Sequence, residues 1–214
     1  KDDEFEALIA AIHRVNQKAL PLVIFAAGLP KIAKIAGDIK SYAERLFQFV
    51  SIGSLENAAG KLALEEPARR WKVSYSEDAL AMILDITECY PYFLQEYGKQ
   101  VWAEVSEERL EIDQSMAEAA YPAFEKSLDE SFFKVRHDRA TPRELEFMIA
   151  MVKCEKLPCS TKAIAEQMQC LLSAVSPLRA QLIHKGFIYS ANRGEVDFTV
   201  PQFDKFLKRI HGIS

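Results

Sequence analysis

Residues 141–152 read TPRELEFMIAMV, and this stretch begins the part of the chain whose fold the sequence predicts best. Thr141 supplies a hydroxyl, Pro142 follows it, and Glu144 can bond back to the backbone of residue 141. Together they form a start signal that satisfies unpaired N–H groups. A helix is therefore predicted to begin at Pro142 and to end near Cys154. Its apolar residues recur every three or four positions and predict one buried face: Leu145, Phe147, Met148, Met151 and Val152.

Two further helices and a hairpin are predicted after this helix. Ser160 or Thr161 caps a short helix that runs through Met168. The third helix has a buried face made of Val175, Leu178, Leu182 and Ile183. Pro177 is tolerated in or near its first turn, and Gly186 ends it.

The β-prone runs 187–189 and 197–200 flank a turn-rich segment and predict a hairpin. The last predicted helix packs back on the core through Phe203, Phe206, Leu207 and Ile210. Residues 141–214 are therefore predicted to form a winged helix-turn-helix domain.

The third helix of such a domain usually lies in the major groove of DNA. The residues predicted to face outward, as candidates for contact with phosphates and base edges, are Ser173, Ser176, Arg179, Gln181, His184 and Lys185 on the helix and Arg193 in the hairpin. Residues 141–214 hold 10 Lys and Arg against 7 Asp and Glu, a net charge of +3, whereas the remainder holds 17 against 24, a net charge of −7. This charge is modest for a dedicated DNA-binding protein. A winged helix that contacts protein, or another part of the same protein, is the alternative, because a fold alone does not fix a function.

The composition indicates a globular protein, with 49% hydrophobic and 27% charged residues in 214. The longest apolar run, residues 19–30, contains two prolines and is too short to cross a bilayer. No signal peptide is evident, so we expect a cytoplasmic protein with no membrane partner. The four cysteines and four histidines lack the spacing of a metal site. No metal ligands are therefore assigned, and the cysteines are expected to be reduced.

The first fifty residues predict part of an α/β domain. A helix with an apolar stripe precedes residues 20–28, LPLVIFAAG, a continuous apolar run typical of a strand buried on both faces of a parallel sheet. Residues 47–52 are a second predicted strand. Because two strands cannot make a doubly covered sheet, we expect residues 1–54 to be the trailing edge of a larger domain and the chain to be a fragment.

Residues 55–126 predict a bundle of four amphipathic helices, at 56–67, 76–86, 90–103 and 107–120. Residues 127–140 are predicted to form a packed helical connector, since they lack the Gly and Ser content of a flexible linker. The predicted core of the bundle consists of Leu62, Leu64, Trp71, Val73, Leu80, Ile83, Leu84, Phe93 and Val101. The predicted fold class is mainly α with small β elements: a remnant edge of an α/β domain, a helical bundle and a winged helix.

Several segments carry a resemblance to a known family. In chain order they are LPLVIFAAGLPKI, KSYAERLFQFVSIGSL, CYPYFLQEYGKQVW, LDESFFKVRHDRATPRELEFM and LIHKGFIYSANRGEVDFTVPQFDKFLKR. The chain resembles the C-terminal portion of a bacterial or archaeal AAA-type P-loop ATPase, of the origin-recognition-like and STAND-related kind. The resemblance covers essentially the whole chain. It implies that residues 22–27 are the strand of the first nucleotide sensor, that residues 55–126 are the ATPase lid, and that a winged helix follows.

The resemblance also implies roles for three residues. Arg45 lies where family members often carry an arginine that reaches the phosphate of a neighbouring subunit. The alternative is an exposed arginine paired with Asp38 or Glu44. Tyr90 and Pro91 lie at a turn that approaches the nucleotide in the family, with Cys89 in place of the family's glycine. Aromatic residues at this turn equally suit the lid core.

ATP hydrolysis requires a phosphate-binding loop, and no glycine-rich segment ending in Gly-Lys-Ser or Gly-Lys-Thr occurs here. We therefore expect ATP and Mg²⁺ to bind the parent protein, no cofactor to bind this chain alone, and no ATPase activity in this chain. The expected partners are DNA and the missing N-terminal ATPase core, and homo-oligomerisation stays open. The leading hypothesis is a regulatory ATPase that couples nucleotide state to DNA binding through its lid and winged helix. The alternative is a protein-interaction scaffold or transcription regulator without ATPase activity.

Overall fold

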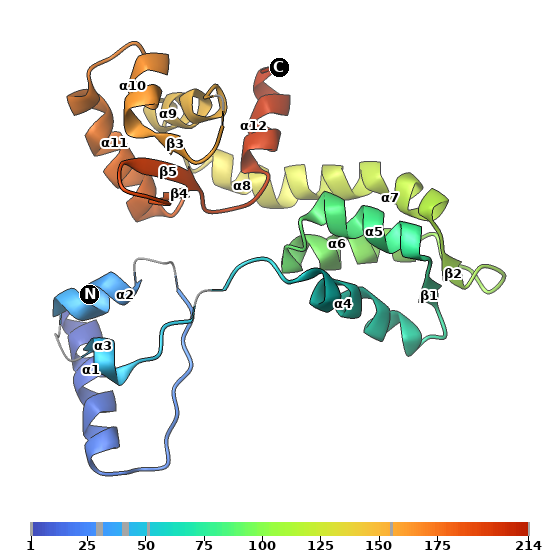
Figure 1. Cartoon of the computed structure of the whole chain (residues 1–214), viewed down its shortest axis with the longest axis horizontal. Helices are drawn as coiled ribbons and strands as arrows, with labels where there is room; N and C mark the ends of the chain where they lie inside the picture. Colours follow the sequence, from blue (N-terminus) through green and yellow to red (C-terminus); the bar gives the residue numbers. More distant parts are fainter. Residues whose placement is uncertain (1, 29–31, 40–42, 51, 155, 214) are drawn as a thin grey trace. The chain divides into compact units, whose positions relative to one another are not determined.

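The computed structural model describes residues 2–28, 32–39, 43–50, 52–154 and 156–213. Its contacts divide the chain into two compact units, Lys1–Ile52 and Gly53–Ser214 (Figure 1). The described residues are mainly helical, with two small sheets, as the sequence predicts. The predicted domain boundaries within these units stay predictions.

The N-terminal unit contains α1 (Asp2–Gln17), α2 (Ile32–Ile39) and α3 (Ala43–Leu46). Its small core consists of Ile9, Ala36 and Ala43. The predicted strands do not form at residues 22–28 or 47–50, whereas Ser51 lies outside the described residues. The side chains of Val23 and Phe25 are 75% and 92% exposed. The prediction of a buried sheet edge was therefore wrong for these residues, because a strand exists only when a neighbour pairs with its backbone groups.

The second unit begins with a helical bundle of α4 (Asn57–Arg69), α5 (Glu77–Thr87), α6 (Pro91–Trp102) and α7 (Gln114–Ser127). Two short strands, β1 (Ser74–Tyr75) and β2 (Glu111–Ile112), pair in parallel at one end of the bundle (Figure 1). The first three predicted helices are confirmed within a few residues. The fourth was predicted to begin at residue 107 and begins instead at Gln114, where the carboxylate of Asp113 accepts the N–H of Met116 at 3.0 Å.

The core of the bundle contains six of the nine predicted residues: Leu64, Val73, Leu80, Ile83, Phe93 and Val101. Leu84 is half-buried. Two assignments were wrong, because Leu62 is 50% exposed and Trp71 is 73% exposed. Trp71 follows the end of α4, so the helical period no longer determines which way its side chain points.

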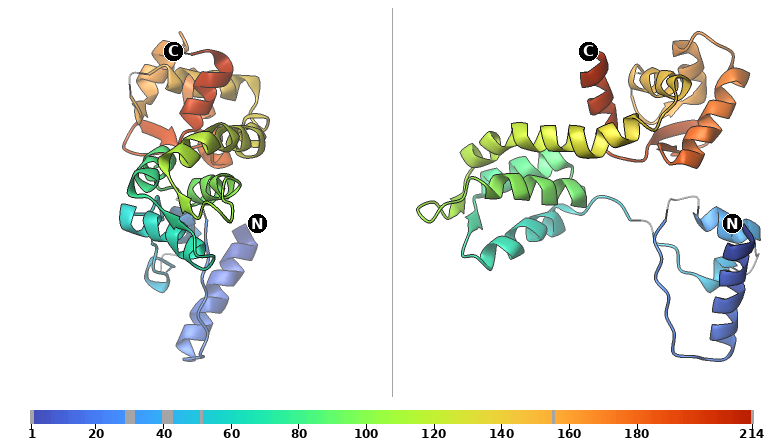
Figure 2. Two further views of the ribbon diagram at one scale, coloured as in Figure 1. Left: turned by 90° about the vertical axis from the view of Figure 1, so that its right-hand side faces the viewer. Right: turned by 180° about the vertical axis from the view of Figure 1, so that it is seen from behind.

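Residues 128–137, within the predicted connector, are helical. After α7 the chain continues through a π-helical turn, η1 (Leu128–Phe133), into α8 (Lys134–His137). Figure 2 shows α7, η1 and α8 as one continuous rod that leads from the bundle to the C-terminal helices. Phe133 lies against Phe93 of the bundle and Phe206 near the C-terminus, with ring centroids 5.9 and 5.3 Å away. The bundle and the C-terminal region therefore share one continuous core.

The C-terminal region begins with three helices, α9 (Pro142–Val152), α10 (Thr161–Gln167) and α11 (Leu172–Lys185). The predicted start of α9 is confirmed, because Thr141 and Glu144 form both hydrogen bonds of a capping box. Ser160 caps α10 and accepts the N–H of Ala163. Pro177 lies inside α11 rather than in its first turn, since this helix begins earlier than predicted.

A small antiparallel sheet and a final helix complete this region. The strands β3 (Cys159–Ser160), β5 (Glu195–Phe198) and β4 (Ile188–Tyr189) pair in that spatial order. Gly186 ends α11 with a positive φ of 77°, as predicted for a helix C-cap. In α12 (Phe203–His211), Phe203, Phe206 and Leu207 are buried as predicted, whereas Ile210 is 44% exposed.

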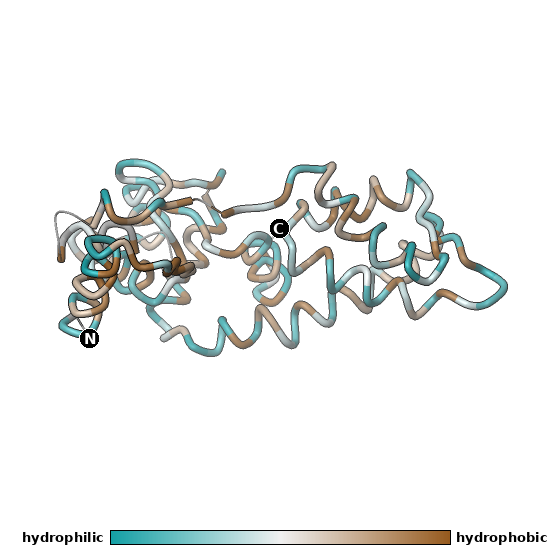
Figure 3. The backbone as a smooth tube through the Cα atoms, turned by 90° about the horizontal axis from the view of Figure 1, so that it is seen from below, coloured by the Kyte–Doolittle hydropathy of each residue, from teal (hydrophilic) through white to brown (hydrophobic). Residues whose placement is uncertain are grey.

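Hydrophobic and hydrophilic residues alternate along the helices in Figure 3, as expected for helices with one buried face. None of the helices in the described ranges combines the length and hydropathy that a bilayer crossing requires.

Candidate nucleic-acid interface

The predicted interface residues on α11 lie on its solvent-exposed side. Ser173, Ser176, Gln181 and His184 are all exposed, while Val175 and Leu182 anchor the opposite side of the helix in the core. Arg193 is exposed in the turn between β4 and β5. The structure therefore leaves this polar face of α11 accessible to a partner.

Lys185 forms an ion pair inside the protein. Its Nζ lies 2.7 Å from Oε2 of Glu144, a carboxylate that is only 1% exposed. The same oxygen accepts hydrogen bonds from the backbone N–H and the hydroxyl of Thr141, at 2.8 and 3.0 Å. Burial acts to raise the pKa of Glu144, but the hydrogen bonds from Lys185 and Thr141 outweigh it and lower that pKa. Lys185 thus joins the end of α11 to the start of α9, a role that its place in the sequence does not indicate.

Arg179 also makes an internal contact. It is half-buried, and its Nη2 donates to the Oγ of Ser190 at 2.9 Å. Ser190 follows β4, so Arg179 links α11 to the hairpin. Its Nε is buried and has no hydrogen-bond partner among the described residues. These contacts make Arg179 a positioning residue for the hairpin.

The α11 face is therefore polar but carries few cations that are free to bind phosphate. Arg193 has no ion pair or side-chain hydrogen bond within the described part of the chain. Next to the polar face, Leu171 and Leu172 at the start of α11 are 76% and 51% exposed. Side-chain hydroxyl and amide groups can bind base edges or protein, and two exposed leucines favour an apolar contact.

The turn that the resemblance assigns to nucleotide lies at the N-terminus of α6. Tyr90 is the residue before the helix and Pro91 is its first residue. The Tyr90 ring packs 4.8 Å from that of Phe93. Cys89 has a φ of 53°, in the left-handed region that favours glycine.

Arg45 is exposed on α3 of the N-terminal unit. The side chains of its predicted partners, Asp38 and Glu44, lie outside what the structure describes. Arg45 is thus accessible, and its role stays a prediction.

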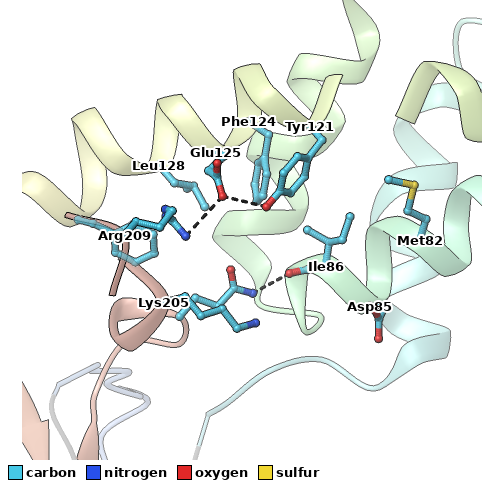
Figure 4. Close-up of a pocket in the computed structure, with 11 residues that line it drawn as sticks. Met82, Asp85, Ile86, Tyr121, Phe124, Glu125, Leu128, Lys205 and Arg209 are labelled. Carbon is cyan, nitrogen blue, oxygen red and sulfur yellow. Dashed lines mark hydrogen bonds and ion pairs between the residues drawn. The ribbon is translucent and has the colours of Figure 1, made fainter. Parts of the chain in front are cut away.

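A cavity of about 390 Å³, lined by both apolar and polar side chains, lies where α12 meets α5 and α7 (Figure 4). Gln202 donates to the carbonyl of Ile86 at 2.6 Å, and Lys205 pairs with Glu88 at 2.8 Å. Arg209 pairs with Asp129 at 2.5 Å. These contacts hold α12 against the bundle. They also leave Lys205 and Arg209, the cations that line the cavity, already paired with carboxylates.

No group of three or more His, Cys, Asp and Glu side chains in the described ranges is arranged to hold a metal ion. A protein-family model described as a domain of unknown function (DUF8462) matches residues 130–207. This match runs from η1 into α12 and so includes α9, α10, α11 and the sheet. None of the curated proteins compared with the chain matches it.

Proposed function

We propose that residues 141–214 are a winged helix-turn-helix domain that binds duplex DNA through α11 and the β4–β5 hairpin. The order of three helices and a three-stranded antiparallel sheet supports the fold. The exposed polar face of α11 is the observation that carries the function. The side-chain amide of Gln181 can form two hydrogen bonds with adenine, and the guanidinium group of Arg193 can bind phosphate.

Binding of a fluorescein-labelled 20-base-pair random duplex by the full chain, measured as anisotropy at low and rising salt, tests this proposal. We expect Arg193→Ala to weaken binding and to reduce the slope of log K against log salt by about 0.9, the value for one phosphate contact. Gln181→Ala should weaken binding without changing that slope. Arg143→Ala is the matched control, because Arg143 is 60% exposed and already pairs with Glu146 on α9. Absence of duplex binding at low salt contradicts the proposal.

A protein-docking role is the second candidate, and the exposed Leu171 and Leu172 favour it. Lys185 and Arg179 favour it as well, since both are used inside the domain. In this case the duplex does not bind, and replacement of both leucines by serine abolishes association with the protein partner without changing the stability of the chain.

We further propose that α4–α7 form the lid of an AAA-type, origin-recognition-like ATPase that couples nucleotide state to the winged helix. The support comes from the order of the elements after residue 55, from the Tyr90-Pro91 turn and from the core that the bundle shares with the C-terminal region. The unpaired segments at residues 22–28 and 47–50 give this proposal no support. The chain itself should not hydrolyse ATP, because its sequence has no phosphate-binding loop. Calorimetry with Mg-ATP and a phosphate-release assay test this, and micromolar binding or metal-dependent turnover contradicts it.

A further inference from the structure

The end of α4 carries three exposed cations within four residues. Arg69, Arg70, Trp71 and Lys72 are consecutive, and all four are exposed. The indole of Trp71 is 73% exposed, which is unusual for the largest apolar side chain. We call these four residues the α4 tip.

The backbone of the α4 tip is well fixed. The N–H of Val73 donates to the carbonyl of Ala68 at 3.1 Å, and the N–H of Lys72 donates to that of Arg69 at 3.0 Å. This is the hydrogen-bond pattern of a Schellman helix end. Ala68 and Val73 are buried on either side and anchor the turn. The structure therefore presents the four side chains to solvent from a defined scaffold.

Lys72 occupies the position in this turn where glycine is favoured, with a φ of 61°. A lysine costs more than a glycine in the left-handed region. The turn nevertheless forms with lysine at this position, and it leaves the Lys72 side chain exposed next to Trp71 in the sequence.

The cations of the α4 tip have no carboxylate partner. Among the described residues, Arg69, Arg70 and Lys72 make no ion pair and no side-chain hydrogen bond, whereas Lys61 on the same helix pairs with Glu77 at 2.6 Å. The negative end of the helix dipole favours cations here. That effect does not explain an exposed indole between them.

We propose that the α4 tip binds single-stranded nucleic acid, with Trp71 stacked on a base and Arg69, Arg70 and Lys72 bound to the flanking phosphates. Unstacked bases offer the flat surface that an isolated indole requires, and guanidinium groups bind phosphate in two places. Duplex DNA fits less well, because its bases are already stacked on each other. An anionic membrane also fits less well, because a flat bilayer would meet the exposed carboxylate of Glu66 on the last turns of α4. This site is separate from the α11 face and does not depend on it.

The test is the binding of a fluorescein-labelled oligothymidylate 20-mer to the full chain, measured as anisotropy across a salt series. Replacement of Arg69, Arg70 and Lys72 together by alanine should reduce the slope of log K against log salt by about 2, the value for three phosphates on a single strand. Trp71→Leu should weaken binding by about 5- to 100-fold, the loss expected for one stacked base, and leave the slope unchanged.

The matched control replaces Lys99, Lys126 and Lys134 by alanine. It removes the same charge from the same unit, but from lysines that lie near Glu96, Glu130 and Asp138. We expect the control to bind the oligonucleotide as the parent chain does. Arg193→Ala should also leave this binding unchanged, which separates the α4 tip from the proposed duplex site. The proposal is overturned if the control variant loses as much affinity for the oligonucleotide as the α4-tip variant, or if Trp71→Leu leaves this affinity unchanged. Binding to phosphatidylserine vesicles without binding to the oligonucleotide also overturns it.

Discussion

Replacement of Lys185 by methionine tests whether this lysine serves the fold. The substitution removes the ammonium group and keeps most of the length of the side chain. Glu144, which is 1% exposed, is then left with the two donors of Thr141. A buried carboxylate without a counter-charge destabilises the folded state, because water cannot replace the lost partner.

The size of the effect follows from the burial of the two groups. Breaking a fully buried pair costs about 3–5 kcal/mol. Since the Lys185 side chain is 37% exposed and the Thr141 donors remain, we expect a smaller loss in the free energy of unfolding, about 2 kcal/mol. For a unit of this size the melting temperature should fall by about 4–8 °C. Guanidinium unfolding at pH 7, followed by circular dichroism, measures the free energy directly.

The effect should also depend on pH. In the parent chain the pKa of Glu144 is lowered below its usual value of 4.5. The carboxylate therefore contributes stability above the unfolded pKa, and this contribution is lost as the pH falls through the folded pKa. In the Lys185→Met variant the lowering contribution of the ammonium group is gone and burial acts to raise the pKa, so Glu144 should take up a proton at a higher pH than in the parent chain, which relieves its penalty. The difference in the free energy of unfolding between the two proteins should therefore shrink from pH 7 to pH 4. A difference that stays constant with pH, or one below about 0.5 kcal/mol at pH 7, refutes the reasoning.

Lys162→Met is the matched control. Lys162 is 82% exposed and lies 3.9 Å from Glu166, itself 67% exposed, so its loss should cost less than about 0.5 kcal/mol. Adding Glu144→Gln to the Lys185→Met variant should recover part of the loss, because the unpaired charge is then gone.

Two further substitutions test other parts of the second unit. Gly186→Ala should reduce the free energy of unfolding by about 1 kcal/mol, since Gly186 has a φ of 77°. Gly186→Asn should reduce it less, because asparagine tolerates the left-handed region. Denaturant unfolding compares the two variants, and equal losses contradict this explanation. Arg209→Leu should increase the rate of amide hydrogen exchange in α12 and η1, because it removes the ion pairs with Asp129 and Glu125 at 2.5 and 3.4 Å. Unchanged exchange rates there show that these ion pairs do not hold α12 in place.

Local chemistry accounts for what the sequence predicted well. Thr141 and Glu144 are three residues apart, and their capping box needs no other part of the chain. Gly186 marks the end of α11 for the same reason, since the left-handed conformation depends on the residue itself. The helices α9 to α11 and the strands β4 and β5 were therefore predictable within a few residues, whereas β3 was not predicted.

Interactions between distant residues account for what was missed. The pair of Lys185 and Glu144 joins residues 41 positions apart, so Lys185 was assigned to an interface instead. Residues 22–27 have the composition of a buried strand, but a strand needs partners that composition does not supply. Trp71 was assigned to the core because its hydrophobicity predicts burial, whereas the turn after α4 directs it to solvent.

Whether a lysine or arginine is already paired with a carboxylate determines whether its binding to a nucleic acid yields net free energy. A cation that already holds a buried carboxylate must give up that contact to bind a phosphate, so the exchange yields little free energy. Lys185 is in this position, and Arg209 already pairs with the half-buried Asp129 and Glu125, whereas Arg193 and the cations of the α4 tip exchange only water for phosphate. Net charge therefore understates the capacity of this protein to bind polyanions. A total of −4 includes many carboxylates that are used in internal pairs, whereas the cations of the α4 tip and Arg193 make no ion pair among the described residues.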